Sequence, residues 1–255
     1  MQSKHIVIVG GTSGSGRVLV RRFSEKQNLV SLLGRHPSPE VQQHIPGVSF
    51  YQVDLSDINN ILKVINQLVA DNGKISHLIF YQRFRGTGDN WEGELQISLT
   101  ATKLIIETST KLFDGSDENS IVVVSSLAGH LIHEEQPVSY HMAKAGLNQM
   151  VRYYAVMLGS RRIRVNCVSP ATVIKDESKQ YYTEQVDLRK LYEEIIPLHR
   201  MGTSEDIADV IEFLCSDKSS YITGQEIIVD GGLSLVGQAS LARHLGGLDN
   251  LKVTR

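Results

Sequence analysis

A buried strand that runs directly into a glycine-rich turn and then into a helix is the feature that most constrains the fold of this chain. Residues His5–Val9 are mostly apolar and β-branched, which is typical of a strand inside a parallel sheet. Gly10, Gly14 and Gly16 follow, and apolar residues then recur at helical spacing within Ser15–Lys26. The N–H groups and the dipole of such a helix N-terminus attract anions. The segment therefore predicts a phosphate-binding turn, although a glycine turn that binds nothing has the same spacing.

The alternation of strand and helix continues along the 255 residues. We expect strands at His5–Val9, Leu29–Leu33, Val48–Val53, His77–Tyr81, Ile121–Ser125, Arg164–Val168 and Glu226–Val229. We expect helices near Ser15–Lys26, Ile58–Asp71, Glu94–Leu112, Ser139–Gly159 and Ser204–Ser216. This pattern predicts a Rossmann-like α/β fold, a doubly wound parallel seven-stranded sheet between two helical layers. We expect one domain over residues 1–255, with a C-terminal tail at 233–255.

Tyr140 and Lys144 are four residues apart and lie on one face of the expected helix Ser139–Gly159. The ammonium can lie beside the phenol and stabilise its ionised form, which prepares the phenol for proton transfer to a carbonyl oxygen. Ser125 and Ser126 precede them by one loop. Ser126 is the better candidate to polarise that oxygen, because Ser125 continues the strand. The alternative for Tyr140 is a half-buried core aromatic.

Together these motifs resemble the short-chain dehydrogenase/reductase family, in its single-domain branch, and the likeness extends from Lys4 to Gly232. The family's glycine motif corresponds to Gly10, Gly14 and Gly16, its adenine-contacting pair to Asp54 and Leu55, and its catalytic triad to Ser126, Tyr140 and Lys144. Three later segments match in the family's order: Arg164–Pro170, Met201–Ala208 and Ile222–Gly232.

The resemblance implies an NAD(P)-dependent oxidoreductase that reduces a carbonyl to an alcohol, or runs the reverse reaction, by hydride transfer. Tyr140 is expected to exchange the proton, Ser126 to orient the carbonyl and Lys144 to hold the nicotinamide ribose. Ser98 takes the place of the asparagine in the family's proton relay. The expected cofactor-binding residues, besides Tyr140 and Lys144, are Gly10, Thr12, Ser13, Gly14, Ser15, Gly16, Arg35, Asp54, Leu55, Tyr81 and Val173.

The end of the second strand predicts which dinucleotide is used. Gly34 and Arg35 lie about 20 residues past the glycines, where a carboxylate would bind the ribose hydroxyls of NAD and an arginine would bind the 2′-phosphate of NADP. No carboxylate follows until Glu40. We therefore expect NADP(H), the alternative being that Arg35 is an ordinary solvated charge.

Several positions depart from the family pattern. Phe80-Tyr81-Gln82-Arg83 replaces the family's Asn-Asn-Ala-Gly, and Val9, Ser15, Ala171 and Lys175 stand at other altered positions. These changes leave open a second hypothesis, a dinucleotide-binding scaffold or regulator with little chemistry. A nucleotide-sugar epimerase or dehydratase is disfavoured, because such proteins need a longer substrate domain.

The substrate pocket is expected beneath Thr172–Pro197, which we interpret as a mobile lid. Arg83 and Arg85 should lie near its mouth. They could bind a phosphate or a carboxylate, but solvated loop charges are the favoured interpretation, and His130 and His133 are likewise interpreted as exposed loop residues.

Composition limits the partners. Twenty-six basic against 28 acidic residues give a net charge of −2, which provides no general field for nucleic acid or an anionic membrane. Cys167 and Cys215 lie in apolar runs and are expected to be buried thiols. No metal-ligand spacing, signal peptide or run of about 18 apolar residues occurs. We expect a cytoplasmic protein that binds a small carbonyl or alcohol substrate and no metal.

Two expected helices carry more apolar residues than one face against a sheet can absorb. These residues are Leu104, Ile105, Ile106, Met150, Val151, Tyr153, Tyr154 and Met157. Such an excess indicates an interface, and in the family these helices pack against their copies. We expect a homodimer or homotetramer, to which the tail adds a second contact through Leu241, Leu245 and Leu248.

Overall fold

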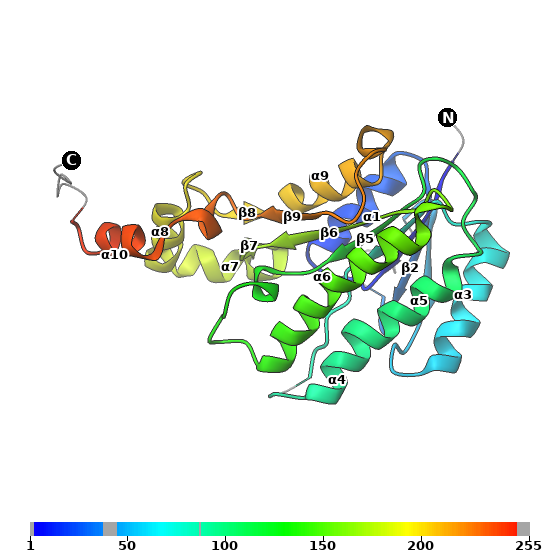
Figure 1. Cartoon of the computed structure of the whole chain (residues 1–255), viewed down its shortest axis with the longest axis horizontal. Coiled ribbons are helices and arrows are strands. Elements are labelled where there is room, and N and C mark those ends of the chain that lie inside the picture. Colours follow the sequence, from blue (N-terminus) through cyan, green and yellow to red (C-terminus); the bar gives the residue numbers. More distant parts are fainter. Residues whose placement is uncertain (1–2, 38–44, 87, 249–255) are drawn as a thin grey trace.

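A parallel sheet forms the centre of the computed structural model, which describes residues 3–37, 45–86 and 88–248 (Figure 1). Glu40 lies outside the described residues. The seven predicted strands are confirmed as β1 (His5–Val9), β2 (Leu29–Gly34), β3 (Val48–Gln52), β4 (His77–Phe80), β5 (Ser120–Val124), β6 (Arg164–Pro170) and β9 (Glu226–Val229). They pair in the order β3-β2-β1-β4-β5-β6-β9. The order reverses between β1 and β4, and ligands bind at such a switch point, outside the carboxyl ends of the strands.

Burial on both faces explains why the strands are almost continuously apolar. In β1, Val7 and Val9 pack into the core on one face of the sheet, whereas Ile6 and Ile8 pack into the core on the other. All four side chains are fully buried.

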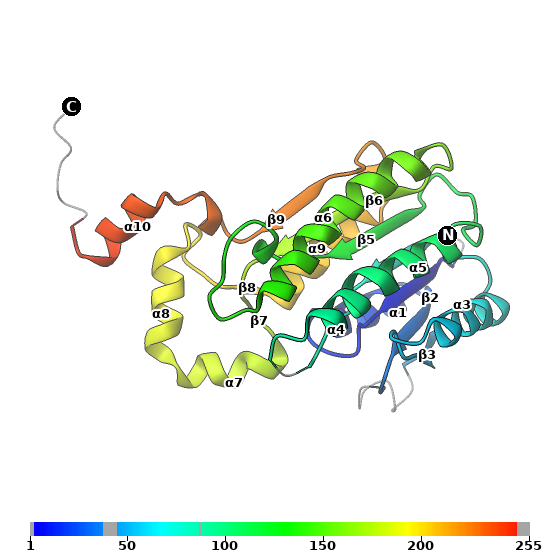
Figure 2. The same cartoon turned by 60° about the horizontal axis from the view of Figure 1, so that its bottom comes forward.

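Two layers of helices cover the sheet (Figure 2). Helices α3 (Ile58–Asn72), α5 (Ala101–Ser109) and α6 (Val138–Gly159) supply the core on one face, and α1 (Ser15–Glu25) and α9 (Ser204–Leu214) supply it on the other. The expected single helix 94–112 is instead α4 (Trp91–Leu95), a π-helical turn (Gln96–Thr100) and α5.

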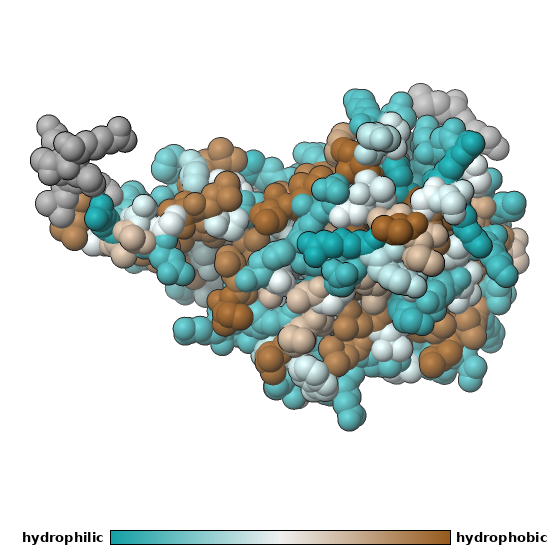
Figure 3. All heavy atoms as spheres, viewed as in Figure 1, coloured by the Kyte–Doolittle hydropathy of each residue, from teal (hydrophilic) through white to brown (hydrophobic). Residues whose placement is uncertain are grey.

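The predicted apolar surplus on α5 and α6 is only partly available for an interface. Ile105, Ile106, Val151 and Tyr154 are core residues, so the prediction that they are surplus was wrong. The exposed large apolar residues of α6 are Val138, Met142, Tyr153, Val156 and Met157. Hydrophobic and hydrophilic residues are interspersed over the face of the molecule seen in Figure 3.

The segment expected to be a lid contains regular structure. Strand β7 (Val173–Ile174) pairs with β8 (Gly202–Thr203), and helices α7 (Asp176–Glu184) and α8 (Val186–Ile195) lie between them in the sequence. The tail adds α10 (Gln238–Leu245). Figures 1 and 2 show α7, α8 and α10 at one end of the molecule, remote from the N-terminus. None of the helices in the described ranges is both long and apolar enough to cross a membrane.

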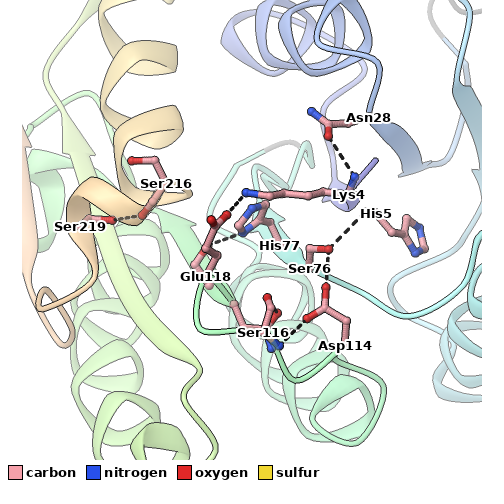
Figure 4. A network of polar contacts seen from close by, with 12 residues as sticks. Lys4, His5, Asn28, Ser76, His77, Asp114, Ser116, Glu118, Ser216 and Ser219 are labelled. Atoms are coloured by element: carbon pink, nitrogen blue, oxygen red, sulfur yellow. Dashed lines mark hydrogen bonds and ion pairs between the residues drawn. The ribbon is translucent and has the colours of Figure 1, made fainter. Parts of the chain in front are cut away.

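A network of polar side chains occupies the amino ends of the strands, on the opposite edge of the sheet (Figure 4). Lys4 forms an ion pair with Glu118, and the Ser76 hydroxyl donates to Asp114 Oδ2 at 2.7 Å. His77 Nδ1 lies 2.9 Å from the Ser120 hydroxyl, and burial lowers the pKa of His77 to about 3. This network joins the starts of β1, β4 and β5.

Candidate active site

The loops at the carboxyl ends of the strands surround a cleft of about 980 Å³. Its lining contains the predicted residues Gly10, Thr12, Ser13, Gly14, Ser15, Arg35, Asp54, Leu55, Tyr81, Ser126, Tyr140, Lys144 and Val173. Two predicted residues, Gly16 and Ser98, do not line it. The fold therefore brings together in one cleft residues that are more than 160 positions apart in the sequence.

The glycines allow the turn after β1 to pack closely. Gly10 has a φ of +83°, and a Cβ there would lie 2.5 Å from the backbone of Gln82 in the loop after β4. A Cβ on Gly16 would lie 2.5 Å from the Cα of Gly11. Gly16 therefore serves the packing of the turn against α1, which explains why it does not line the cleft.

A carboxylate from α7 lies against the predicted phosphate-binding turn. The Gly14 N–H donates to Glu177 Oε1 at 2.9 Å, and Arg17 Nη2 lies 3.1 Å from the same oxygen. Burial opposes ionisation of Glu177, but the Gly14 hydrogen bond and the cations of Arg17 and Lys175 hold its pKa below the ordinary value. The Glu177 carboxylate occupies the position at the start of α1 where an anionic ligand would bind. The turn therefore fits a dinucleotide phosphate.

Tyr140 and Lys144 lie on the first two turns of α6, which begins after Pro137. Lys144 Nζ is 5.4 Å from the centroid of the Tyr140 ring and donates to the carbonyl oxygen of Val124 at 3.2 Å. Lys144 is buried, whereas Tyr140 is partly exposed to the cleft. The ammonium is thus held beside the phenol at the end of β5.

The two adjacent serines have different environments. The Ser125 hydroxyl is buried and donates to the carbonyl oxygen of Lys144 at 3.2 Å, so it fastens α6 to the end of β5. The Ser126 hydroxyl accepts a hydrogen bond from the Ala128 N–H at 3.2 Å, and this residue is partly exposed. Ser126 can still donate its own proton to a ligand in the cleft.

Ser98 lies within the π-helical turn and is buried. Its hydroxyl donates to Glu94 Oε1 at 2.6 Å, and its carbonyl oxygen accepts from the Thr102 hydroxyl at 2.7 Å. Its neighbours Gln96 and Ile97 line the cleft instead. Participation of Ser98 in a proton relay stays a prediction.

The loop after β4 presents polar atoms that lack partners. Phe80 ends β4 and is a core residue, so the altered segment begins at Tyr81. Among the described residues, the buried Tyr81 hydroxyl and Gln82 Oε1 have no hydrogen-bond partner. Burial raises the pKa of Tyr81. Unpaired buried polar atoms are costly, and both residues belong to the lining of the cleft.

The end of the cleft beside the carboxyl ends of β2 and β3 contains Arg35 and Asp54. Asp54 Oδ1 accepts from the N–H and the hydroxyl of Ser56 at 2.9 and 2.7 Å. These hydrogen bonds, with a smaller contribution from the Arg35 cation, lower the pKa of Asp54. The guanidinium of Arg35 therefore shares this end of the cleft with an ionised carboxylate that Ser56 holds.

Three further cations lie around the middle of the cleft. The Cζ atom of Arg83 is 5.1 Å from the Tyr140 ring centroid, and Arg85 Nη2 donates to the Ser13 hydroxyl at 3.0 Å. The stem of Lys175 lies against Gly14. Burial and the Arg83 cation lower the pKa of Lys175. From the sequence, Lys175 is only a departure from the family pattern, and Arg83 and Arg85 are interpreted as solvated loop charges.

Sequence reasoning missed Glu177 and Gln136 altogether. The only signal for Glu177 is its place in the first turn of a helix, and nothing in the sequence relates it to Gly14, 163 residues away. No group of three His, Cys, Asp or Glu side chains in the described ranges could hold a metal ion. Cys167 and Cys215 are free and buried.

The family model described as enoyl-(acyl carrier protein) reductase matches residues 10–234. A 3-oxoacyl-[acyl-carrier-protein] reductase, FabG, of Aquifex aeolicus is 30% identical over 250 residues, which cover 91% of this chain and 98% of that protein. A glucose 1-dehydrogenase of Gluconobacter oxydans is 27% identical over 255 residues, covering 92% and 93%.

Solved structures show the same fold. An aldohexose dehydrogenase of Thermoplasma acidophilum superposes with a TM-score of 0.82 at 21% identity, covering 93% of this chain and 96% of that one. A short-chain dehydrogenase/reductase of Burkholderia xenovorans, described as putative, gives 0.80 at 25% identity, covering 93% and 98%.

The strand order, the glycine turn and the Ser–Tyr–Lys cleft define a dinucleotide-dependent oxidoreductase. The chain belongs to the short-chain dehydrogenase/reductase family. Its relatives are dehydrogenases and reductases, so an enzyme is supported over the scaffold hypothesis.

Proposed function

We propose that this protein is an NADP(H)-dependent carbonyl reductase, or the corresponding alcohol dehydrogenase. The observation that carries the proposal is the convergence of Ser126, Tyr140 and Lys144 on the cleft that the glycine turn also lines. The bound nicotinamide supplies or accepts the hydride. Tyr140 gives its hydroxyl proton to the carbonyl oxygen, Ser126 donates a hydrogen bond to that oxygen, and Lys144 stabilises the phenolate that remains.

The residues that would hold the dinucleotide divide along the cleft. The N–H groups of the turn at Gly14 would bind its phosphates in place of Glu177. Arg35 would bind a 2′-phosphate, and this supports NADP(H) over NAD(H). An NADP-dependent mannitol dehydrogenase of Hypocrea jecorina is 29% identical over 72% of this chain, which also supports this choice.

The test is to mix the protein with a panel of ketones and aldehydes, in the presence of NADPH or of NADH. Turnover is measured as the loss of absorbance of the reduced nicotinamide. We expect turnover with NADPH and at least one carbonyl compound. Tight NADPH binding without turnover of any compound would favour the dinucleotide-binding scaffold.

We also propose that two copies associate through α6. Val138, Met142, Tyr153, Val156 and Met157 are exposed on this helix, and exposed apolar patches mark interfaces. Light scattering at micromolar concentration should give at least twice the 28.3 kDa of one chain. A mass near 28.3 kDa would refute association. The buried thiols Cys167 and Cys215 support a cytoplasmic location, which we propose as well.

A further inference from the structure

We propose that Arg83 binds an anionic group of the substrate, a carboxylate or a phosphate, so that the enzyme prefers charged carbonyl compounds to neutral ones. This inference rests on the proposed carbonyl reduction and adds the substrate class. The sequence favoured a solvated loop charge at this position. The structure shows that Arg83 is exposed and that its guanidinium also lies over the ring of Tyr140.

The position of Arg83 relates it to the reacting end of the cleft. Its Cζ lies 5.1 Å from the centroid of the Tyr140 ring, and its Nη2 donates to Gln136 Oε1 at 3.2 Å. Gln136 belongs to the loop between Ser126 and α6. Ser126, at the start of this loop, is the second group that would contact the carbonyl. Arg83 therefore bridges the loop after β4 and the loop after β5 beside Tyr140.

Charge balance in the cleft favours an anion there. Within residues 3–37, 45–86 and 88–248, no carboxylate oxygen lies within 4.0 Å of the charged nitrogens of Arg83, Arg85 or Lys175. Three carboxylates of the described residues line the cleft: Ser56 holds Asp54, Glu135 lies 3.6 Å from His133 Nδ1, and Glu177 is held by Gly14 and Arg17 and also attracts Lys175. Like charges that face one another without a counter-ion repel, and an anion between them removes that repulsion.

The cofactor accounts for two of the three cations. Arg85 contacts Ser13, and the stem of Lys175 lies against Gly14, so both lie beside the turn that would bind the dinucleotide phosphates. Among the described residues, Arg83 has no hydrogen bond to Ser13 or Gly14, and its guanidinium lies over the Tyr140 ring. Its planar guanidinium can bind a carboxylate or a phosphate through two parallel hydrogen bonds. An α- or β-oxo acid, or a phosphorylated ketone, presents such a group close to its carbonyl.

The test compares substrates in matched pairs that differ in the charged group. The pairs are benzoylformate and its methyl ester, acetoacetate and its methyl ester, and dihydroxyacetone phosphate and dihydroxyacetone. We expect the wild-type kcat/KM to favour the charged member of at least one pair by roughly 10- to 100-fold. The acid pairs and the phosphate pair distinguish a carboxylate from a phosphate.

Three variants locate the effect. Arg83→Gln should remove the preference, mainly by raising KM for the charged member, and Arg83→Lys should restore part of it. Arg85→Gln should weaken NADPH binding but keep the ratio between the two members. Melting temperatures and NADPH dissociation constants, measured on every variant, show that Arg83→Gln folds and binds the cofactor.

The outcomes separate the inference from the function on which it rests. A wild-type preference for the neutral members, or a ratio that Arg83→Gln leaves unchanged, overturns the inference while carbonyl reduction stands. If none of the six compounds is turned over although NADPH binds, both proposals fail.

Discussion

The two edges of the sheet differ in how their charged side chains are partnered. At the amino edge, Lys4 pairs with Glu118 and Ser76 with Asp114 (Figure 4), although the buried Asn119 Nδ2 has no partner among the described residues. At the carboxyl edge, the Arg83 guanidinium faces Tyr140 without a carboxylate within 4.0 Å in the described ranges, and the buried Tyr81 hydroxyl has no partner there.

This difference indicates that the amino edge contributes mainly to folding stability and the carboxyl edge mainly to ligand binding. Paired groups at the amino edge already satisfy one another, so they hold the starts of the strands together and need no ligand. At the carboxyl edge, Arg83 has no carboxylate partner among the described residues, and a ligand could supply one. Substitutions at the first edge should therefore change unfolding, and substitutions at the second should change binding and turnover.

The largest expected effect at the carboxyl edge comes from Lys144→Met, which removes the ammonium and keeps most of the stem. We expect turnover to fall by about 100-fold or more, because the phenolate loses its neighbouring cation. NADPH binding should also weaken, since Lys144 is expected to hold the nicotinamide ribose. Steady-state kinetics and a fluorescence titration of NADPH measure the two effects. Wild-type turnover by this variant would show that Lys144 has no role in catalysis.

At the amino edge, His77 should make unfolding depend on pH. Its pKa is about 3 in the folded protein and 6.5 for the solvated side chain, so the unfolded chain takes up a proton that the folded one excludes. The contribution of neutral His77 to the free energy of unfolding is fully present above pH 6.5. It falls by about 1.4 kcal/mol per pH unit as the pH decreases toward 3.

Urea denaturation between about pH 6.5 and pH 4.5 measures this slope. His77→Asn should show a shallower slope than the wild type, because the other titrating groups remain in both proteins. Its NADPH affinity at neutral pH should be unchanged, since His77 lies on the other edge of the sheet. Equal slopes would contradict the assigned role of His77.

Arg35→Asp tests the proposed binding of a 2′-phosphate at the end of the cleft beside β2. The wild type should bind NADPH at least roughly tenfold more tightly than NADH, and the substitution should abolish or reverse this preference. NADH affinity within the same titration series serves as the internal control. Equal affinities of the wild type for NADPH and NADH would contradict the proposal that Arg35 selects NADP(H).

The smallest expected effect concerns Glu177. Its carboxylate must leave the Gly14 N–H before a phosphate binds there, so Glu177→Gln should tighten NADPH binding roughly two- to fivefold, as expected for a partly exposed contact. Asp176→Asn is the matched control, because Asp176 contacts Arg17 and not Gly14. Weaker NADPH binding by Glu177→Gln would mean that the carboxylate does not compete.

The sequence predicted the strands because each contains an apolar run, fully buried in β1 and β4 and partly buried in the edge strands β3 and β9. It predicted Tyr140 and Lys144 because their spacing is local to one helix. It did not predict α7 and α8, since neither helix has a buried residue. The contact of Glu177 with Gly14 and that of Arg83 with Tyr140 join residues 163 and 57 positions apart, and no local pattern specifies such meetings.

The most direct test of the account is Tyr140→Phe, which removes one hydroxyl from the carboxyl edge. Turnover of the best carbonyl substrate, NADPH affinity and melting temperature should be measured together on this variant and on the wild type. The account predicts a loss of turnover of at least about 100-fold, with nearly unchanged NADPH affinity and melting temperature. Turnover within tenfold of the wild type would contradict the assignment of Tyr140 as the proton donor.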